Sequence, residues 1–222
     1  MKAMILAAGR GERMRPLTDT TPKPLLKVAG KCLIEYHLEN LVRAGIDEVV
    51  INHAWLGEQF ESTLGSGGQY GLQIHYSDEG EKALETAGGI IRALPYLGSE
   101  PFLIINGDIW TDYELSTLVK QTDEMKYLMH LVLVTNRAHH PRGDFDLDEN
   151  NRLLDRPAYT YSGIGIYSPK IFTKLKVGVQ PLAPIIRDMI KQKQVTGEMY
   201  TGAWEDVGTP ERLVELDSRL DT

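Results

Sequence analysis

The amino-acid sequence predicts an α/β protein in which helices cover both faces of a mostly parallel, mixed sheet. Two observations support this prediction. In the first half of the 222 residues, short apolar runs alternate with segments of helical periodicity, as in successive βαβ units. The first and fourth runs, residues 3–7 and 102–105, are apolar throughout, which is typical of strands that are buried on both faces.

The first half supplies strands and helices in alternation. The predicted strands span residues 3–7, 48–51, 72–76 and 102–105. The predicted helices span residues 34–42, 56–64 and 86–94. Gly45 and Gly65 follow the first two helices as C-caps, and Pro95 is expected to stop the third because proline has no backbone N–H to donate.

The second half is less regular. Strands are predicted at residues 130–135, 161–167 and 200–207, and a helix at 181–191. Thr209, followed by Pro210, predicts the start of a terminal helix that runs through Leu220. No segment has the composition of a linker, so residues 1–222 are expected to form a single domain.

Composition narrows the class of protein. The net charge is −7, which disfavours a nucleic-acid scaffold, and a single cysteine, Cys32, excludes a disulfide framework and an all-cysteine zinc site. The sequence has no secretory signal and no apolar run of about 18 residues, so we expect a cytoplasmic protein without a membrane span. Residues 9–31 nevertheless carry six lysines and arginines against two acidic residues, which predicts one localised anion site.

A glycine-rich turn follows the first strand. In the segment LAAGRGERMRP, Gly9 and Gly11 allow a ligand to approach backbone N–H groups, and Arg13 and Arg15 add positive charge. Met14 stands where a dinucleotide fingerprint would have its third glycine, which disfavours a dehydrogenase. The alternative is a plain turn with solvated arginines.

The segment Pro22-Lys23-Pro24 favours the anion site over the plain turn. Flanking prolines limit where Lys23 can point, which is a costly arrangement for a merely solvated lysine.

The run LAAGRGERMRPLTDTTPKPLL resembles the signature of the sugar-phosphate nucleotidyltransferases. The similarity continues through ETAGGI, NGDIWTDYEL, RGDFDL, YSGIGIY and WEDVGTPERL, so it covers essentially the whole chain. Members of this family join a nucleoside triphosphate to a sugar 1-phosphate and release pyrophosphate. The resemblance implies the Rossmann-like sheet of the nucleotide-diphospho-sugar transferase fold.

The resemblance also assigns roles to residues. It implies that nucleotide-binding positions are Ala8, Gly9, Gly11, Glu12, Arg13, Lys23, Glu85, Thr86, Ala87, Gly88 and Gly89. Ala87 stands where the family often has glycine. Arg13 would hold the departing pyrophosphate, and Lys23 would contact the α-phosphate and the incoming sugar phosphate. The implied catalytic residues are Arg13, Lys23 and Asp108.

Asp108 and Asp206 are implied ligands of a catalytic Mg²⁺, an ion that prefers hard oxygen donors. Taken alone, an aspartate at a strand end is more often a cap or turn residue, and the family resemblance outweighs that default. The implied sugar-binding residues are Asn106, Gly143, Asp144, Ser162 and Gly163.

Other polar and aromatic residues have simpler explanations. Adjacent histidines rarely chelate one ion, so His139 and His140 are expected to be structural or close to the sugar. Core packing is the default expectation for Trp55, Trp110 and Trp204. Arg142 is either a ligand for a carboxylate on the sugar or a surface arginine.

Within the family, the resemblance favours UTP and N-acetylmuramate 1-phosphate as substrates, in cell-wall (peptidoglycan) recycling. The alternatives are mannose 1-phosphate with GTP, glucose 1-phosphate with UTP or dTTP, and phosphocholine with CTP. A catalytically silent nucleotide-sensing subunit is disfavoured because Lys23, Asp108 and Asp206 are all present. No nucleic-acid or membrane partner is expected, and the chain is expected to be a monomer or a small homo-oligomer.

Overall fold

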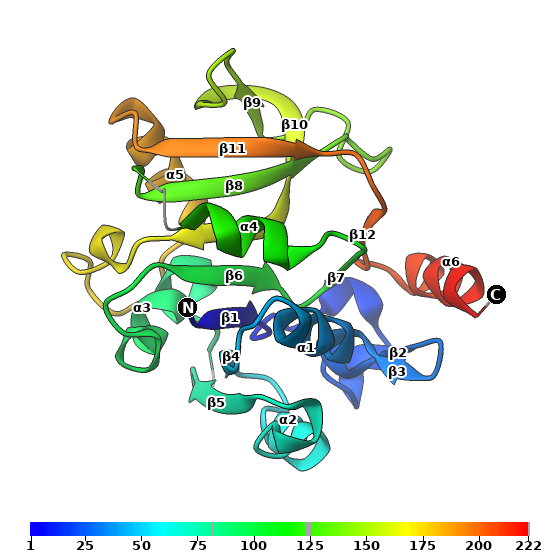
Figure 1. The fold of residues 1–222 in the computed structure, drawn as a ribbon. Helices are drawn as coiled ribbons and strands as arrows, with labels where there is room; N and C mark the ends of the chain where they lie inside the picture. The colour runs from blue at the N-terminus through cyan, green and yellow to red at the C-terminus, as the bar shows by residue number, and fades with distance from the viewer. Residues whose placement is uncertain (81, 123–125, 222) are drawn as a thin grey trace.

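The computed structural model describes residues 1–80, 82–122 and 126–221. Its central sheet has the strand order β11-β8-β10-β6-β1-β4-β5, with β9 paired to β10 (Figure 1). The strands of this sheet are β1 (Ala3–Leu6), β4 (Glu48–His53), β5 (Gln73–Asp78), β6 (Phe102–Asn106), β8 (Met129–Val134), β9 (Phe145–Leu147), β10 (Leu153–Tyr167) and β11 (Val195–Tyr200).

Strand direction changes only around β10 along the main path of the sheet. β6, β1, β4 and β5 run parallel to their neighbours, and β11 runs parallel to β8. The long strand β10 is antiparallel to both β6 and β8 and so joins the two parallel groups. This arrangement confirms the predicted mostly parallel, mixed sheet.

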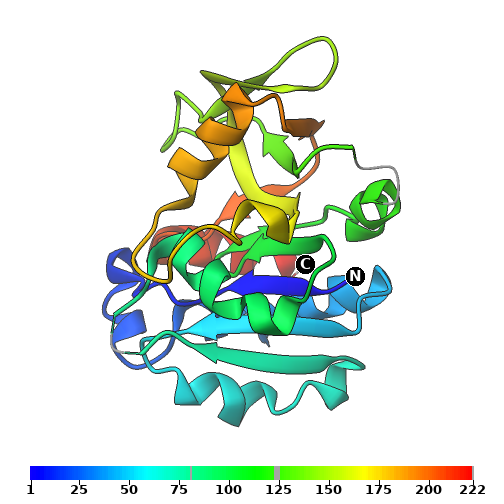
Figure 2. The same cartoon turned by 90° about the vertical axis from the view of Figure 1, so that its left-hand side faces the viewer.

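Helices cover both faces of the sheet. α1 (Leu33–Arg43) and α4 (Leu115–Gln121) lie on one face, and α3 (Glu85–Leu97) and α5 (Leu182–Lys191) lie on the other (Figures 1 and 2). α2 (Glu58–Leu64) lies beside the edge strand β5 (Figure 1). No helix in the described part of the chain has the length and apolar character needed to cross a bilayer.

The central strand β1 shows why both faces are apolar. Ala3 and Ile5 belong to the core on the α1 side, together with Leu38. Met4 belongs to the core on the α3 side, together with Ile90. Successive residues of a strand point to opposite faces, so a strand covered on both sides must be apolar throughout.

The C-terminal helix α6 (Pro210–Leu220) packs away from the main sheet, against the hairpin of β2 (Lys27–Val28) and β3 (Lys31–Cys32) (Figure 1). A third apolar cluster joins it to the glycine-rich turn, because Leu216 shares this cluster with Met14 and Val207. The N–H of Ala29 donates to the Asp217 carboxylate, 2.7 Å away. The end of the chain thus supports a loop near its beginning.

Two sequence predictions were wrong in detail. α3 continues past Pro95 to Leu97. Proline removes one helical hydrogen bond, but the burial of Leu97 in the core outweighs that loss. The single strand predicted at residues 200–207 is divided between β11 and β12 (Trp204–Asp206), and β12 pairs with β7 (Ile109–Thr111) away from the main sheet.

Polar groups gather around Glu198 on β11. The Tyr113 hydroxyl donates to one carboxylate oxygen, while Gln121 Nε2 lies 3.0 Å and His130 Nε2 3.5 Å from the other. Burial raises the pKa of this carboxyl, but the contact with His130 and the hydrogen bonds from Tyr113 and Gln121 outweigh burial and hold the pKa of Glu198 at about 2. The charged form of Glu198 is therefore favoured by the folded state.

We expect Glu198→Gln to lower the free energy of unfolding at pH 7 by about 1–2 kcal/mol, after allowance for solvent screening. Because the pKa is lowered from 4.5 to about 2 on folding, this stabilisation is present above pH 4.5 and disappears as the pH falls toward 2. Urea denaturation at pH 7, 4.5 and 3 measures the difference. Glu149→Gln, at an exposed loop position, is the control. A difference that stays constant over this pH range would contradict the prediction.

Candidate active site

Three adjoining cavities form one groove at the carboxyl ends of β1 and β6, with volumes of about 330, 310 and 350 Å³. We name them by position. The loop cavity lies along the turn after β1, the helix cavity at the start of α3, and the strand cavity along β10 and β12. Asp108 lines all three, Gly9 is shared by the loop and helix cavities, and Arg13 is shared by the loop and strand cavities.

The turn after β1 is shaped by Gly11 and Thr18. Gly11 has a φ of 66°, and a Cβ there would lie 2.9 Å from the Thr18 methyl group, so the position requires glycine. Thr18 Oγ1 donates to the Gly11 carbonyl at 2.8 Å, and the following Met14 is fully buried. The turn is therefore held in place from below, while Gly9 and Arg13 line the groove.

Arg10 does not contribute to the lining of the groove. Its guanidinium lies 3.4 Å from the ring centre of Trp55 and donates to the Thr18 carbonyl. Trp55 is 38% exposed, so the expectation that it packs in the core was wrong, whereas Trp204 is buried as expected. Trp55 instead restrains one arginine of the basic segment through a cation–π contact.

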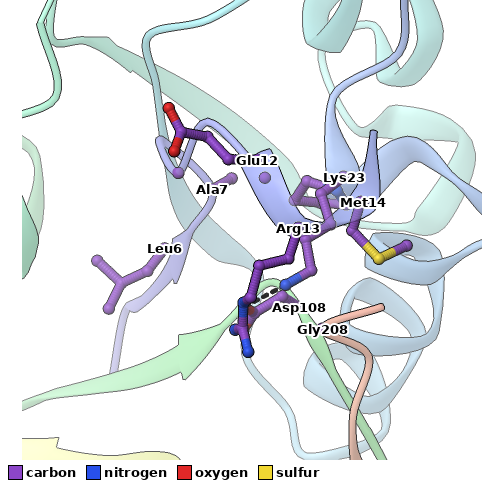
Figure 3. A pocket seen from close by; sticks show the side chains of 11 residues that line it. Leu6, Ala7, Glu12, Arg13, Met14, Lys23, Asp108 and Gly208 are labelled. Carbon is purple, nitrogen blue, oxygen red and sulfur yellow. Dashed lines mark hydrogen bonds and ion pairs between the residues drawn. The ribbon is translucent and has the colours of Figure 1, made fainter. Parts of the chain in front are cut away.

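Lys23 lies in the groove and is 7% exposed. The short 3-10 turn Lys23–Leu25 fixes its backbone, and Nζ lies 2.7 Å from Asp108 Oδ2 (Figure 3). Arg13 extends alongside this ion pair, whereas Glu12 points away from it (Figure 3). Lys23 is therefore a buried cation that faces the groove, and the alternative of a solvated lysine does not hold.

Strand pairing brings Asp206 close to Asp108. In the β12–β7 register Asp206 pairs with Ile109, and the N–H of Val207 donates to the Asp108 carbonyl at 2.9 Å. Both aspartates line the strand cavity. Asp206 Oδ2 also lies 2.9 Å from Arg212 Nη1, on α6, and 3.3 Å from His139 Nε2.

The carboxylates of Asp108 and Asp206 are suitable donors for a divalent cation. In the described residues, no cluster of three or more His, Cys, Asp or Glu side chains is arranged to hold a metal. A cation between these two aspartates would therefore need further oxygen ligands from a bound molecule. Two carboxylates completed by phosphate oxygens are the usual set for Mg²⁺.

A buried hydrogen-bond relay supports the helix cavity. The N–H of Ala7 donates to Asn52 Oδ1 at 2.9 Å, and Asn52 Nδ2 donates to Glu79 Oε1 at 2.6 Å. The other carboxylate oxygen of Glu79 accepts from the N–H of Leu84 at 2.6 Å. A Cβ at Gly89 would lie 2.3 Å from Glu79, so this glycine makes room for the carboxylate.

The sequence analysis missed this relay. The signal in the sequence is that Asn52 and Glu79 each come after a predicted strand. The structure then places these two strands next to each other in the sheet. The relay joins the end of β1 to the segment before α3.

The structure divides the predicted nucleotide-binding residues into two groups. Glu85 and Thr86 line the helix cavity together with Ala8. Gly88 lies behind it, because a Cβ there would be 2.1 Å from the Gly178 carbonyl. The N–H groups of Ala87 and Gly88 donate to the Gln180 carbonyl, at 3.0 and 3.2 Å. Gly88 therefore permits close packing of a loop and contributes no surface to the cavity.

The predicted sugar-binding residues are divided in the same way. Asn106 and Ser162 line the strand cavity, as do His139 and His140. Gly163 lies behind Asn106, since a Cβ there would be 2.6 Å from the Asn106 side chain.

Asp144 and Gly143 lie one layer further back from the strand cavity. Asp144 Oδ1 is 3.1 Å from His140 Nε2, and Asp144 Oδ2 accepts from the N–H of Tyr161 at 2.9 Å. A Cβ at Gly143 would lie 2.6 Å from the Tyr159 carbonyl, so this glycine lets the loop approach β10. Arg142 is exposed and lines none of the three cavities, which favours its role as a surface arginine.

Residues 2–222 match the family model for nucleotidyl transferases. The match agrees with the arrangement described so far, which combines a glycine turn, a buried lysine and two aspartates at strand ends. The chain belongs to this family. Its enzymatic class and the predicted resemblance to the sugar-phosphate nucleotidyltransferases are thereby confirmed.

Two curated relatives match over nearly their whole length. The chain is 52% identical to an N-acetylmuramate α-1-phosphate uridylyltransferase of Neisseria meningitidis serogroup B, covering 98% of this chain and 97% of the relative. It is 33% identical to the enzyme of the same name from Caulobacter vibrioides, covering 98% and 96%.

A solved structure from Bacillus anthracis, named for glucose-1-phosphate thymidylyltransferase, has a TM-score of 0.89 at 24% identity. The alignment covers 100% of this nucleotidyltransferase and 95% of that chain. This similarity confirms the nucleotide-diphospho-sugar transferase fold.

We expect Glu79→Gln to lower the free energy of unfolding by about 1–3 kcal/mol, because glutamine cannot accept hydrogen bonds from both Asn52 and Leu84 without presenting its own N–H₂ to one of them. Loss of the relay should also weaken nucleotide binding, since it loosens the segment beside the helix cavity. Urea denaturation and calorimetric titration with nucleotide measure the two effects. Glu58→Gln, on the exposed face of α2, is the matched control, and equal behaviour of the two variants would contradict the role of the relay.

Proposed function

We propose that this nucleotidyltransferase transfers the uridylyl group of UTP to N-acetylmuramate 1-phosphate, releasing pyrophosphate and forming the UDP-linked sugar. The observation that supports this proposal is the 52% identity, over almost the full length of both chains, to a relative named for that reaction. A second relative with the same name, at 33% identity, agrees with it.

The reaction needs placement and charge neutralisation more than proton transfer. A phosphate oxygen of the sugar 1-phosphate attacks the α-phosphorus of UTP, and the bond from that phosphorus to the bridging oxygen breaks, so that pyrophosphate leaves with the electron pair. The attacking phosphate is already an anion at neutral pH, so the step requires no general base. We place UTP with its base in the helix cavity and its phosphates in the loop cavity, and the sugar in the strand cavity.

The cationic side chains of the groove fit these roles. Lys23, buried between Pro22 and Pro24, would hold the α-phosphate and approach the attacking phosphate. Arg13, which lines both the loop and strand cavities, would stabilise the charge that develops on pyrophosphate. Backbone N–H groups near Gly9 and Gly11 would orient the triphosphate.

We further propose that Asp108 and Asp206 hold Mg²⁺ together with phosphate oxygens of the substrates. When bound, the ion would neutralise phosphate charge and reduce the repulsion between the two anionic substrates. Lys23 and Arg212, which pair with these carboxylates in the chain itself, would then have N–H groups available for the substrates. We place the reaction in the cytoplasm, in the recycling of cell-wall sugars.

A panel of substrates tests the proposed reaction. With Mg²⁺ and inorganic pyrophosphatase, we expect UTP and N-acetylmuramate 1-phosphate to give the highest kcat/KM for phosphate release. The margin over the acceptors without a carboxylate should be at least about tenfold, since one charged contact to the acidic sugar is sufficient for that difference.

The panel pairs UTP, dTTP, GTP and CTP with N-acetylmuramate, mannose and glucose 1-phosphates and with phosphocholine. Turnover of mannose 1-phosphate with GTP, but not of the muramate with UTP, would overturn the proposed substrates. Absence of turnover with any pair would favour a nucleotide-sensing subunit.

Asp108→Asn is expected to lower Mg²⁺-dependent turnover by about 100-fold or more, because it removes a hard anionic donor and the counter-ion of Lys23 together. Kinetics with saturating substrates measure the loss, and calorimetric titration with Mn²⁺ in the presence of UTP measures metal binding directly. Asp112→Asn, on the segment after β7, is the control because Asp112 lines none of the three cavities. Full activity of Asp108→Asn would refute the metal assignment.

A further inference from the structure

Arg212 is a charged residue beside the groove, and its position is not explained by the glycine turn or by the aspartate pair. It lies in the first part of α6, and its side chain is only 13% exposed. Nη1 lies 2.9 Å from Asp206 Oδ2 and 3.0 Å from His139 Nε2. Asp206 and His139 both line the strand cavity. Arg212 itself lines none of the three cavities, and the C-terminal helix brings its guanidinium into contact with two residues that do.

A second guanidinium, that of Arg13, reaches the same place. A Cβ built on Gly208 would lie 2.5 Å from Arg212 Nη2 and 3.1 Å from Arg13 Nη2. The two arginines therefore converge above one glycine. Gly208 lines the loop cavity, so this point is at the border between the loop and strand cavities. A side chain at position 208 would occupy the space next to the guanidiniums of Arg13 and Arg212, at the border between the two cavities.

The local charge balance is incomplete without an anionic ligand. Lys23 pairs with Asp108 and Arg212 with Asp206, whereas Arg13 makes no hydrogen bond or ion pair with any residue in the described part of the chain. Like charges this close repel each other, and one carboxylate between two guanidiniums offsets only part of that repulsion. Such an arrangement favours a bound phosphate, whose geometry suits bidentate contacts with arginine.

α6 does not require the Arg212–Asp206 contact for its attachment. Thr209 caps the helix by accepting from the N–H of Arg212, Asp217 accepts from the N–H of Ala29, and Leu216 is buried in the third apolar cluster. Because α6 is anchored without the Arg212–Asp206 ion pair, we infer that Arg212 serves to bind a ligand.

We propose that Arg212, positioned by Asp206 and His139, binds the phosphate of the sugar 1-phosphate. This inference rests on the proposed function and adds a specificity residue to it. The sugar phosphate must approach the α-phosphorus from the side opposite pyrophosphate. We therefore place the α-phosphate between the two guanidiniums, at the border of the loop and strand cavities, with Arg13 toward pyrophosphate and Arg212 toward the sugar phosphate. If Asp206 holds Mg²⁺, the N–H group of Arg212 that now pairs with Asp206 would be available to that phosphate.

The test compares Arg212→Ala, Arg212→Lys and His139→Ala with the wild type, varying each substrate in turn. For Arg212→Ala we expect KM for the sugar 1-phosphate to rise about 10- to 100-fold, the range for one lost charge-assisted contact, while KM for UTP changes less than about twofold. Arg212→Lys should restore part of the loss, because lysine keeps the charge but not the fork of donors. His139→Ala should give a smaller increase in the same direction.

Arg219→Ala is the matched control, since Arg219 lies on the same helix, 3.6 Å from Glu205 and close to the Trp110 ring, and neither of these partners lines any of the three cavities. Calorimetric titration of the sugar 1-phosphate into enzyme loaded with Mg²⁺ and a non-hydrolysable UTP analogue measures binding without turnover. Unchanged affinity in Arg212→Ala, or parallel losses for UTP and the sugar phosphate, would overturn the assignment.

A second sugar 1-phosphate separates the two proposals. Equal losses for N-acetylmuramate 1-phosphate and a sugar 1-phosphate without a carboxylate support a phosphate contact. A loss confined to the muramate would place Arg212 on the sugar carboxylate and overturn the phosphate assignment. If the wild type uses only another sugar 1-phosphate, the proposed function fails, and Arg212 is tested with that substrate.

Discussion

A lysine ammonium that is removed from water needs a counter-ion, and in this enzyme Asp108 provides it from the opposite side of the groove. The Lys23–Asp108 pair, at 2.7 Å, joins the segment after the glycine turn to the segment after β6. Asp108 lines all three cavities, so this contact lies where the proposed sites for base, phosphates and sugar meet. The same two groups hold each other in the chain and would hold substrate and metal during the reaction.

Around this pair, structural contacts converge from distant parts of the sequence. The β12–β7 pairing places Asp206 next to Asp108, and the Asn52–Glu79 relay joins the end of β1 to the segment before α3. Helix α6 shares an apolar cluster with Met14 of the glycine turn and brings Arg212 into contact with Asp206, which lines the strand cavity. Each contact fixes a loop at the carboxyl edge of the sheet, where ligands bind in open α/β folds. Rigid elements therefore position groups whose work is electrostatic.

Local patterns explain most of the fold that could be predicted from the sequence. Apolar runs such as residues 102–105 can be buried on both faces only in a covered, mostly parallel sheet, and glycines after helical segments stop helices. The errors arose where packing outweighed local preference. Pro95 stays inside α3 because Leu97 is held in the core, and Trp55 remains partly exposed over Arg10. The division of residues 200–207 depends on which partner each strand finds, and periodicity carries no information about partners.

The sequence by itself determined the family, the basic turn, Lys23 and the two aspartates, because these features reside in contiguous motifs whose chemistry can be recognised without coordinates. Only the tertiary structure decided which residues share a cavity. It placed Gly88 and Gly163 behind the lining, left Arg142 exposed, and brought Arg212 and His139 together across 73 positions of the chain. The physical reason is that contacts of this kind depend on strand pairing and helix packing between distant segments. The proposed anion site thus draws on residues from both ends of the chain.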